Sequence, residues 1–327
     1  MNLAKYSHDF KSKRILIIGD AIIDTYLWGE INRMSPEAPV PVVDVAVNQN
    51  DSRLGGAANV ALNLKQLGAE SILCTVIGND NRGIIFEQLM QEQGLSLDGM
   101  LISNGRKTTT KTRVIANNKH QLRIDEEDTY PIKVENQLFN LIEKLIHNID
   151  AIILQDYNKG VLTKNIIEKI LSLANNKNIP TIVDPKKHNF LSYKNCTLFK
   201  PNLKEIEGGL NIIEDINDFN EIEKTTSKLR DIISAKAILL TLSNKGIFLN
   251  TNNGSKLTES TTTNVIDVSG AGDTVVSVAA MCLACNIDLN ELAILANIAG
   301  GIVCEKVGVV PITNQELFNR AKKLLNV

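Results

Sequence analysis

Short runs of almost continuously apolar residues alternate along this chain with longer amphipathic segments, and this alternation limits the fold more than any other feature. The short runs predict strands at Arg14–Ile18, Ser71–Ile77, Ala151–Leu154, Thr181–Val183, Thr197–Phe199 and Lys236–Leu242. The amphipathic segments predict helices at Ala57–Leu67, Arg82–Gln93, Ile132–His147, Lys164–Asn175, Asp218–Ile233, Gly272–Cys285, Leu289–Cys304 and Gln315–Leu325. Strands that are apolar on both faces are typical of parallel sheets that helices cover on both sides. We therefore expect an α/β fold in which a doubly wound, mostly parallel sheet is flanked by helices.

Two segments depart from this alternation of apolar and amphipathic segments, because apolar and polar residues alternate in them with a period of two. One is Val40–Val47, and the other surrounds Asn117-Asn118, a dipeptide that favours a hairpin turn. We interpret them as a small antiparallel β-lid over the site, formed by inserted segments at about 25–48 and 106–125. No internal repeat or linker is visible, so residues 1–327 are expected to form a single domain.

The charge of the chain does not indicate a nucleic-acid or membrane partner. Its 35 basic and 37 acidic residues leave a net charge of −2, without a long block of one sign.

The polar N-terminus shows no secretory signal, and the longest apolar runs, Val275–Cys285 and Leu292–Cys304, are too short to span a bilayer. Cys282 and Cys285 have the spacing of a metal or redox pair, but their apolar helical setting indicates core residues. These features predict a cytoplasmic protein with reduced thiols.

The segment Asp267-Val-Ser-Gly-Ala-Gly-Asp273-Thr carries the strongest chemical signal in the chain. Its small residues leave backbone N–H groups uncovered just before an apolar helix, where free amides and the helix dipole favour an anion. A carboxylate at this place is a poor phosphate ligand but a good base. The segment therefore favours phosphoryl transfer to a hydroxyl, with amides holding the transferring group and Asp273 accepting the hydroxyl proton. A glycine-rich turn whose aspartate caps a helix would explain the same residues without catalysis.

Two further carboxylates, Asp20 and Asp24, follow the first predicted strand. Ligands bind at the carboxyl ends of strands in open parallel sheets, so these side chains are placed to accept hydrogen bonds from sugar hydroxyls. The same stretch lacks the Gly-x-Gly-x-x-Gly pattern of a dinucleotide site, which argues against a nicotinamide oxidoreductase. Alternatively, each aspartate could stabilise a turn or cap a helix without binding a ligand.

A pair of glycines, Gly55 and Gly56, precedes the helix that carries Asn59. Glycines let a backbone approach a ligand closely, and the amide of Asn59 can both donate and accept hydrogen bonds. An ordinary helix start explains the pattern as well.

Asn202 and Glu205 lie one helical turn apart, so they could hold a hydrated Mg²⁺ through water or form a helix N-cap with an acidic first turn.

Basic residues that could reach a substrate phosphate lie on the lid segments and in one turn. They are Lys111, Arg113, Arg123 and Lys159, and the last of these closely follows Asp156. Surface charge is the default explanation for any one of them.

In this order, the three motifs Gly55-Gly-x-x-Asn59, Asn202-x-x-Glu205 and Asp267-x-x-Gly-x-Gly-Asp273 resemble the ribokinase-like (PfkB) carbohydrate kinase family. The resemblance extends from about Arg14 to Leu317. Further stretches are similar to the bacterial D-glycero-β-D-manno-heptose 7-phosphate kinases of lipopolysaccharide core synthesis: Gly19-Asp20-x-x-x-Asp24, Ser35–Val42, Gln121–Asp125 and Gln155–Gly160. Some of these kinases carry a fused nucleotidyltransferase domain, and the length of this chain resembles the monofunctional form.

The resemblance implies ATP-dependent phosphorylation of the anomeric hydroxyl of the heptose 7-phosphate, and it implies a role for each motif. Asp273 would be the base, and the amides of Gly270, Ala271 and Gly272 would form the anion hole. Asn202 and Glu205 would organise Mg²⁺–ATP, with Glu205 reaching the metal through water. Thr241, Ser243 and Gly246 would lie along the nucleotide, with Asn297 near its base. The groups expected at the sugar phosphate are Asp20, Asp24, Gly55, Gly56, Asn59, Asp156 and the four basic residues named above.

Many relatives also use a monovalent cation such as K⁺ beside the anion hole. Asp267, Ser269 and carbonyls near Lys306 and Gly308 would be its ligands here. One departure from the family pattern is Ser277, where relatives often have glycine, and it is expected to affect packing and not chemistry. The family further implies a β-lid that often mediates dimerisation, and hence a homodimer.

Two other functions remain open from the sequence. Another sugar or sugar-phosphate kinase of the same family, such as a ribokinase or fructokinase, would use the same catalytic motifs. A catalytically silent sensor of sugar phosphates or nucleotides could share the fold, although the joint presence of Asp273, Asn202 and Glu205 argues against it.

Overall fold

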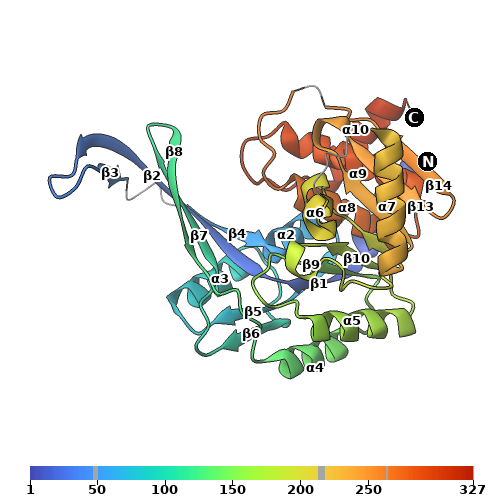
Figure 1. The fold of residues 1–327 in the computed structure, drawn as a ribbon, viewed down its shortest axis with the longest axis horizontal. Coiled ribbons are helices and arrows are strands. Elements are labelled where there is room, and N and C mark those ends of the chain that lie inside the picture. Colours follow the sequence, from blue (N-terminus) through green and yellow to red (C-terminus); the bar gives the residue numbers. More distant parts are fainter. Residues whose placement is uncertain (47–50, 213–217, 263, 327) are drawn as a thin grey trace.

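The computed structural model describes residues 1–46, 51–212, 218–262 and 264–326. Its main element is a nine-stranded sheet in the order β14-β13-β12-β11-β10-β9-β1-β5-β6 (Figure 1). The strands are β1 (Arg14–Gly19), β5 (Glu70–Gly78), β6 (Met100–Ser103), β9 (Ala151–Gln155), β10 (Thr181–Asp184), β11 (Leu198–Phe199), β12 (Ala237–Thr241), β13 (Ile247–Thr251) and β14 (Gly254–Thr258). Neighbours from β6 to β12 pair in parallel, whereas β13 and β14 close one edge as an antiparallel hairpin.

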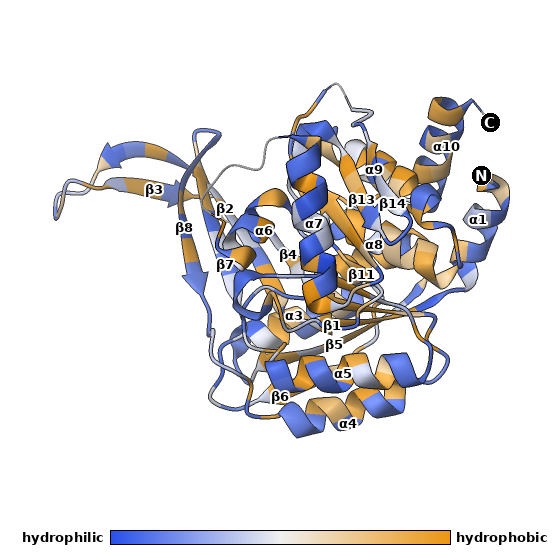
Figure 2. Cartoon of the chain, turned by 45° about the vertical axis from the view of Figure 1, so that its right-hand side comes forward, coloured by the Kyte–Doolittle hydropathy of each residue, from blue (hydrophilic) through white to orange (hydrophobic). Residues whose placement is uncertain are grey.

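Helices cover both faces of this sheet, because its strands are apolar on both sides. On β1, Ile15 and Ile17 pack into one core, while Leu16 and Ile18 pack into the other. The first core is covered by α1 (Leu3–Asp9), α2 (Ala57–Gln66), α3 (Asn81–Glu92), α8 (Ala271–Ala284), α9 (Leu289–Cys304) and α10 (Asn314–Leu325). The second is covered by α4 (Glu135–Leu145), α5 (Lys164–Asn176), α6 (Leu203–Leu210) and α7 (Phe219–Ile233). Figure 2 shows the central strands as largely apolar and the outer sides of α4 and α5 as largely polar.

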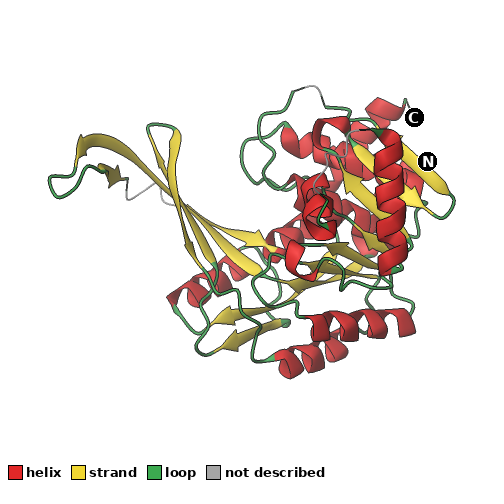
Figure 3. Cartoon of the chain, in the orientation of Figure 1, coloured by secondary structure: helices red, strands yellow, loops and turns green. Residues whose placement is uncertain are grey.

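A second, smaller sheet projects from the body of the molecule (Figures 1 and 3). Its order is β3-β2-β7-β8, with β4 also paired to β2. The strands are β2 (Ala21–Met34), β3 (Pro41–Val45), β4 (Asp51–Gly56), β7 (Thr110–Ala116) and β8 (Lys119–Glu126). Most of these pairs are antiparallel, but β2 and β7 run parallel. We call this sheet the lid.

The lid contains the two segments that were predicted from their period of two. Asn117 and Asn118, with φ angles of 52° and 59°, form the two-residue turn between β7 and β8. The predicted lid segment 25–48 ends at Val47 and Asn48, which lie outside the described residues. The small sheet also extends further back along the chain than predicted, because β2 begins at Ala21, only two residues after β1 ends.

The predicted α/β fold with a flanked, mostly parallel sheet is confirmed, and every predicted strand and helix of the main layer has a counterpart. The sequence did not predict α1, β6 or the edge hairpin β13–β14, and for α6 it suggested only the N-cap at Asn202. In the described part of the chain, no helix combines the length and apolar character needed to cross a membrane.

Candidate active site

The turn before α8 is held by the side chain of Asp267. One of its carboxylate oxygens accepts the amide of Ser269, and the other accepts the amide of Gly308, each at 2.9 Å. Burial alone would raise the pKa of Asp267, but these amides outweigh it and lower the pKa below the ordinary value. Gly270 follows with φ = 78°, a conformation that favours glycine, and it is the N-cap residue of α8.

Asp273 lies in the first turn of α8 and is buried. Three side chains donate hydrogen bonds to its carboxylate. Asn59 Nδ2 lies 2.7 Å from one oxygen, while Tyr157 Oη and Gln155 Nε2 lie 2.8 Å and 3.2 Å from the other. These donors come from α2, from the end of β9 and from the turn after β9, so this one carboxylate of α8 joins parts of two other elements.

The surroundings of Asp273 raise its pKa to about 6. Burial is the largest cause, the hydrogen bond from Asn59 acts against it, and the nearby carboxylate of Asp184 adds to it. A carboxylate with this pKa is ionised at neutral pH and is still basic enough to accept a proton, which suits a general base.

Two amide oxygens beside this carboxylate have no hydrogen-bond partner although they are buried. They are Asn59 Oδ1 and Gln155 Oε1, whose amide nitrogens both donate to Asp273. A buried acceptor without a donor is unfavourable, and a hydroxyl-rich ligand would satisfy it. The surroundings of Asp273 therefore offer two acceptors of the kind to which sugar hydroxyls can donate.

A buried ion pair lies next to the turn of α8. Lys200 Nζ and a carboxylate oxygen of Asp184 are 3.2 Å apart, and both side chains are almost fully buried. A Cβ atom added to Gly272 would lie 3.9 Å from each partner, so the pair lies beside the backbone that we predicted as the anion hole.

Lys186 brings a second positive charge to the same region. Its Nζ pairs with Glu205 and lies 5.7 Å from the centre of the Tyr157 ring. Burial lowers the pKa of Lys186, but the carboxylates of Asp184 and Glu205 outweigh this and raise it. The side chain is therefore a permanent cation near the α8 N-terminus.

Asn202 and Glu205 form a capping box at the start of α6. The Asn202 side chain accepts the amide of Glu205, and a carboxylate oxygen of Glu205 accepts the amide of Asn202, each at 2.9 Å. The structural alternative from the sequence is therefore realised. It does not compete with a role at a metal, because a carboxylate offers about four lone-pair sites and this one uses two, for Asn202 and Lys186.

The predicted nucleotide residues come from three parts of the chain: the end of β12, the turn after it and α9. Thr241, at the end of β12, forms a bridge with Asn202. Ser243 and Gly246 follow in a tight turn with φ angles of 55° and 99°. Asn297, on α9, donates to the carbonyl of Glu259 at 2.8 Å, which ties α9 to the segment after β14.

The carboxylate of Asp20 organises the turn after β9. Its two oxygens accept the backbone amides of Tyr157, Lys159 and Val161 at 2.9, 3.1 and 3.0 Å. Asp156 is buried beneath this turn, where it accepts hydrogen bonds from Tyr193 Oη at 2.6 Å and from the side chain of Asn189. Asp156 also accepts the backbone amide of Asn158 at 2.7 Å, so Asp20 and Asp156 both hold the backbone of this turn.

The paired glycines are needed where β4 meets β2. A side chain at Gly55 would collide with the carboxylate of Asp24, and a Cβ at Gly56 would lie 2.5 Å from the carbonyl oxygen of Asp20. Gly56 also has φ = 58°. Asp24 itself pairs with Arg113, whose Nη1 lies 2.5 Å from its carboxylate.

The remaining predicted basic residues are all engaged in ion pairs. Lys111 contacts Asp125 at 3.2 Å and Glu127 at 3.4 Å, while Lys159 Nζ contacts Glu127 at 2.7 Å. Arg123 contacts Asp125 at 2.8 Å. Arg113 and Asp24 form a separate ion pair on the strands beside Lys111 and Arg123, and the two sets together make a cluster of four cations and three carboxylates that joins the lid to the turn after β9. We call it the lid network.

Ser277 was noted as a departure from the family pattern. Its hydroxyl donates to the carbonyl of Asp273, four residues earlier, at 2.7 Å. The hydroxyl is therefore satisfied within α8 and adds no group to the site.

Five side chains at the site were missed from the sequence: Gln155, Tyr157, Asp184, Lys186 and Lys200. Each lies at or just after the end of β9, β10 or β11. The strand-end rule that drew attention to Asp20 would have found them as well.

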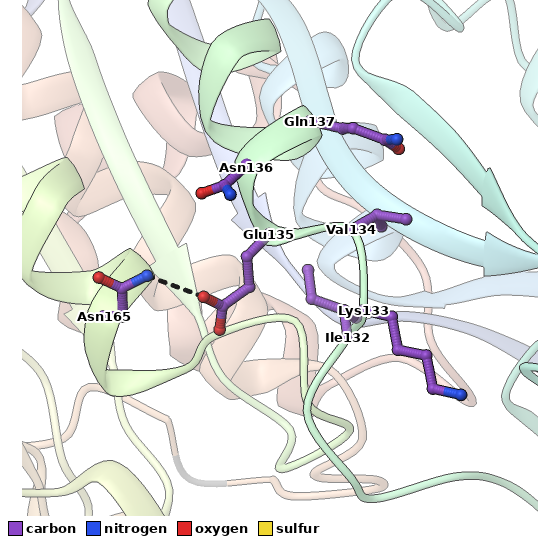
Figure 4. A pocket seen from close by; sticks show the side chains of 7 residues that line it. All are labelled: Ile132, Lys133, Val134, Glu135, Asn136, Gln137 and Asn165. Carbon is purple, nitrogen blue, oxygen red and sulfur yellow. Dashed lines mark hydrogen bonds between the residues drawn. The ribbon is translucent and has the colours of Figure 1, made fainter.

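A separate hollow of about 470 Å³ lies at the start of α4 (Figure 4). It is lined by residues 132–137 and by Asn165, whose side chain donates to Glu135 at 2.8 Å. That hydrogen bond joins α4 to α5, and none of the lining residues belongs to the constellation around Asp273.

Comparison with known proteins agrees with this geometry. A family model described as pfkB family carbohydrate kinase matches residues 12–315. Two curated relatives, both named bifunctional protein HldE, come from Campylobacter jejuni strain RM1221 and from Trichlorobacter lovleyi, and are 40% and 38% identical over 304 and 308 residues. Each alignment includes 93% of this chain but only 64% and 62% of the respective relative's length.

Two solved structures illustrate the likeness of the fold. Arabidopsis thaliana ribokinase complexed with ribose and ATP has a TM-score of 0.76 at 17% identity, covering 95% of this chain and 99% of that one. Escherichia coli phosphofructokinase-2 in complex with potassium has a TM-score of 0.75 at 17% identity, covering 94% and 98%. At such low identities the likeness establishes the fold alone.

Proposed function

The chain belongs to the pfkB family of carbohydrate kinases, and we propose that its acceptor is the anomeric hydroxyl of D-glycero-β-D-manno-heptose 7-phosphate. The product would be the 1,7-bisphosphate, on the route to ADP-heptose for the lipopolysaccharide core. ATP-dependent phosphorylation of a sugar is the activity of the family. The choice of heptose 7-phosphate is supported by the Ser35–Val42 and Gln155–Gly160 motifs and by the similarity to HldE proteins along most of the chain.

The observation that carries the proposal is the buried carboxylate of Asp273 in the first turn of α8, with a pKa of about 6. It lies among amide oxygens that need hydroxyl donors, on Asn59 and Gln155. A base, a helix N-terminus for a phosphoryl group and acceptors for hydroxyls are the three features that phosphoryl transfer to a sugar requires.

The proposed chemical step is an in-line displacement at phosphorus. The anomeric oxygen forms a bond to the γ-phosphorus of ATP while the bond from that phosphorus to the bridging oxygen of ADP breaks. Asp273 accepts the proton of the anomeric hydroxyl, and no bond to the sugar carbon breaks. The amides of Gly270, Ala271 and Gly272 stabilise the charge on the transferring group, and Lys186 supplies a further positive charge nearby.

Mg²⁺ would be held at Glu205 through water, together with Asn202, and would neutralise the charge of the ATP phosphates. The unused lone-pair sites of Glu205 fit a metal-bound water. For a monovalent cation, Asp267 and Ser269 remain the proposed ligands. The carboxylate of Asp267 already shapes this turn through two backbone amides, and its lowered pKa keeps it charged.

The lid network is our proposed site for the phosphate of the acceptor. Its four cations exceed its three carboxylates by one, so a dianionic phosphate that took the place of one carboxylate would leave the charges balanced. Lys159 and Lys111 converge on Glu127, and a phosphate that displaced this carboxylate would meet both ammonium groups.

We further propose a cytoplasmic homodimer that associates through the lid. The five cysteines are all free, which supports a reducing compartment. Large apolar side chains are exposed on the lid, among them Met34, Val40, Leu122 and Ile124, and exposed apolar patches often mark contacts between chains.

ADP release, measured with a coupled assay, tests the proposed acceptor. The panel contains ATP–Mg²⁺ alone and with heptose 7-phosphate, ribose, fructose or fructose 6-phosphate. We expect turnover with heptose 7-phosphate to exceed that with the other sugars by at least about 10²-fold, because a sugar without a phosphate at this position lacks the charge-assisted contacts with the lid network. The Asp273→Asn variant serves as the control and should lose about 10²–10⁴-fold in kcat while remaining folded.

Each outcome of this assay separates the alternatives. Strong turnover with ribose or fructose and none with heptose 7-phosphate would favour another sugar kinase of the family. No ADP release with any sugar from a folded protein would favour a silent sensor. Near-normal turnover of Asp273→Asn would remove Asp273 as the base.

A further inference from the structure

Tyr157 stands out because it joins the proposed base to a rigidly held turn. It lies two residues after the end of β9, and its hydroxyl donates to Asp273 at 2.8 Å. Its own backbone amide donates to Asp20, which also holds the amides of Lys159 and Val161. On the other side of the turn, Arg106 donates to the carbonyl of Lys159. The phenol is thus attached to Asp273 from a backbone that is fixed at several points.

The count of hydrogen bonds at Asp273 shows what this attachment achieves. An ionised carboxylate has about four lone-pair sites. Asn59, Gln155 and Tyr157 occupy three of them. One site is then left for an acceptor hydroxyl, and with donors on both oxygens the carboxylate cannot rotate to offer another.

We propose that Tyr157 is a positioning residue for phosphoryl transfer, whose hydroxyl fixes the orientation of the Asp273 carboxylate and stabilises its ionised form. The inference rests on the proposed role of Asp273 as the base. Tyr157 itself does not transfer a proton in this scheme, so it differs from the catalytic residues named above.

The surroundings of Tyr157 keep its hydroxyl a donor. Burial, together with the carboxylates of Asp273 and Asp184, raises the pKa of the phenol well above its ordinary value. The groups that face Asp273 and Tyr157 from the neighbouring elements are Asp184 from β10, Lys186 just after it, and Lys200 after β11. The two lysines are already paired with Glu205 and Asp184, so neither is free to replace the phenol as a donor.

A donor to the ionised carboxylate lowers the pKa of Asp273, and removing it must raise that pKa. In Tyr157→Phe we expect the acidic limb of the pH–rate profile to move upward by about one unit. With a limb near pH 6 in the parent protein, a shift of one unit lowers the ionised fraction at pH 6 from about one half to about one tenth, which is about a fivefold loss. A further loss of kcat that does not depend on pH is expected from the freed carboxylate, with little change in KM.

Tyr193→Phe is the matched control. Tyr193 is fully buried and, like Tyr157, it donates to a carboxylate, that of Asp156, at 2.6 Å, but it makes no hydrogen bond to Asp273. We expect this variant to lower stability and to leave the acidic limb in place. All profiles are measured with the same sugar and ATP–Mg²⁺, so that ionisation of the substrates cancels in the comparison.

A second substitution keeps the shape of the side chain. Replacement of Tyr157 by 3,5-difluorotyrosine makes the phenol a stronger donor, so the acidic limb should move to lower pH, opposite to the Phe variant. This measurement stands even if Tyr157→Phe does not fold.

Three results would overturn the proposal. One is a limb that stays in place in both Tyr157 variants. The second is an equal shift in Tyr157→Phe and Tyr193→Phe, which would indicate general loosening of the turn. The third is a raised KM for the sugar with an unmoved limb, which would make Tyr157 a substrate contact. A parent protein without sugar-dependent ADP release would instead refute the proposed function, so the two failures are distinguishable.

Discussion

At the scale of single residues, the proposed chemistry depends on how Asp273 is buried. Burial raises its pKa, and the hydrogen bond from Asn59 limits the rise, leaving a value of about 6. With an ordinary pKa near 4, the carboxylate would be a weaker base, while without its donors its pKa would rise further. The balance of these effects leaves the group ionised and basic under physiological conditions.

This pKa predicts the pH dependence of the reaction. The base works only when ionised, so kcat at saturating sugar and ATP–Mg²⁺ should be constant above about pH 7. Well below pH 6 it should fall by about tenfold per unit as Asp273 becomes protonated. Steady-state rates between pH 5 and 8 test this, with circular dichroism at each pH to show that the protein stays folded. A kcat that does not change between pH 5 and 7 would contradict the role assigned to Asp273.

Some residues of the candidate site could be predicted from the sequence, while others could not, because their position depends on contacts between distant parts of the chain. Asp273 and Asn59 belong to glycine-containing motifs whose backbone requirements are visible in the chain. Tyr157 and Lys186 do not belong to any comparable sequence motif. Their place at the site depends on how the turns after β9 and β10 fold back toward α8, and this is decided by distant partners such as Asp20 and Glu205.

At the scale of elements, the start of α6 serves two purposes in our scheme. Asn202 and Glu205 cap the helix and would also organise Mg²⁺–ATP. The chain offers a matched comparison, because Thr313 and Glu316 form the same kind of capping box at the start of α10.

We predict that Asn202→Ala and Thr313→Ala lower the free energy of unfolding by similar amounts, about 1 kcal/mol each, because each removes one N-cap side chain. Only Asn202→Ala should also raise the KM for ATP–Mg²⁺ or lower kcat. Urea unfolding and steady-state kinetics on both variants check this. Equal, unimpaired kinetics in the two variants would mean that the box at α6 is purely structural.

Helices and strands were predicted correctly where a periodic apolar pattern extends over many residues. They were missed where the structure depends on pairing between strands that lie apart in the sequence. The helices α8 and α9 and the central strands were found within a few residues. The edge hairpin β13–β14 was missed because its second strand is short and only partly buried. The lid was identified from its alternation, but the parallel pairing of β2 with β7 involves two segments far apart in the chain and has no local signal.

At the scale of the whole molecule, the lid has two chemically different faces. Along β8, Arg123 and Asp125 point to one side and take part in the lid network, whereas Leu122 and Ile124 point to the other. These two apolar side chains are 52% and 47% exposed. The edge position of β8 also leaves backbone groups available for pairing. A second copy of the chain on the apolar face would cover it and leave the charged face for the substrate.

This arrangement leads to a test of the oligomeric state. We expect the parent protein to be a dimer by light scattering coupled to size exclusion, and the double variant Leu122→Lys, Ile124→Lys to be a monomer, because four buried ammonium groups in a symmetric interface would be very unfavourable. Leu324→Lys is the control, since Leu324 is 38% exposed but lies on α10, away from the lid (Figure 1). It should leave the dimer intact.

The kinetics of the monomeric variant then show what the dimer contributes. The charged face of the lid carries Lys111 and Arg113, so a lid that loses its partner should hold the acceptor less firmly while Asp273 and the α8 N-terminus remain unchanged. We therefore expect a higher KM for the sugar, a nearly unchanged KM for ATP–Mg²⁺ and a smaller effect on kcat. A parent protein that is monomeric at micromolar concentration would refute the dimer outright. A dimer that survives the double variant would place the contact on another surface.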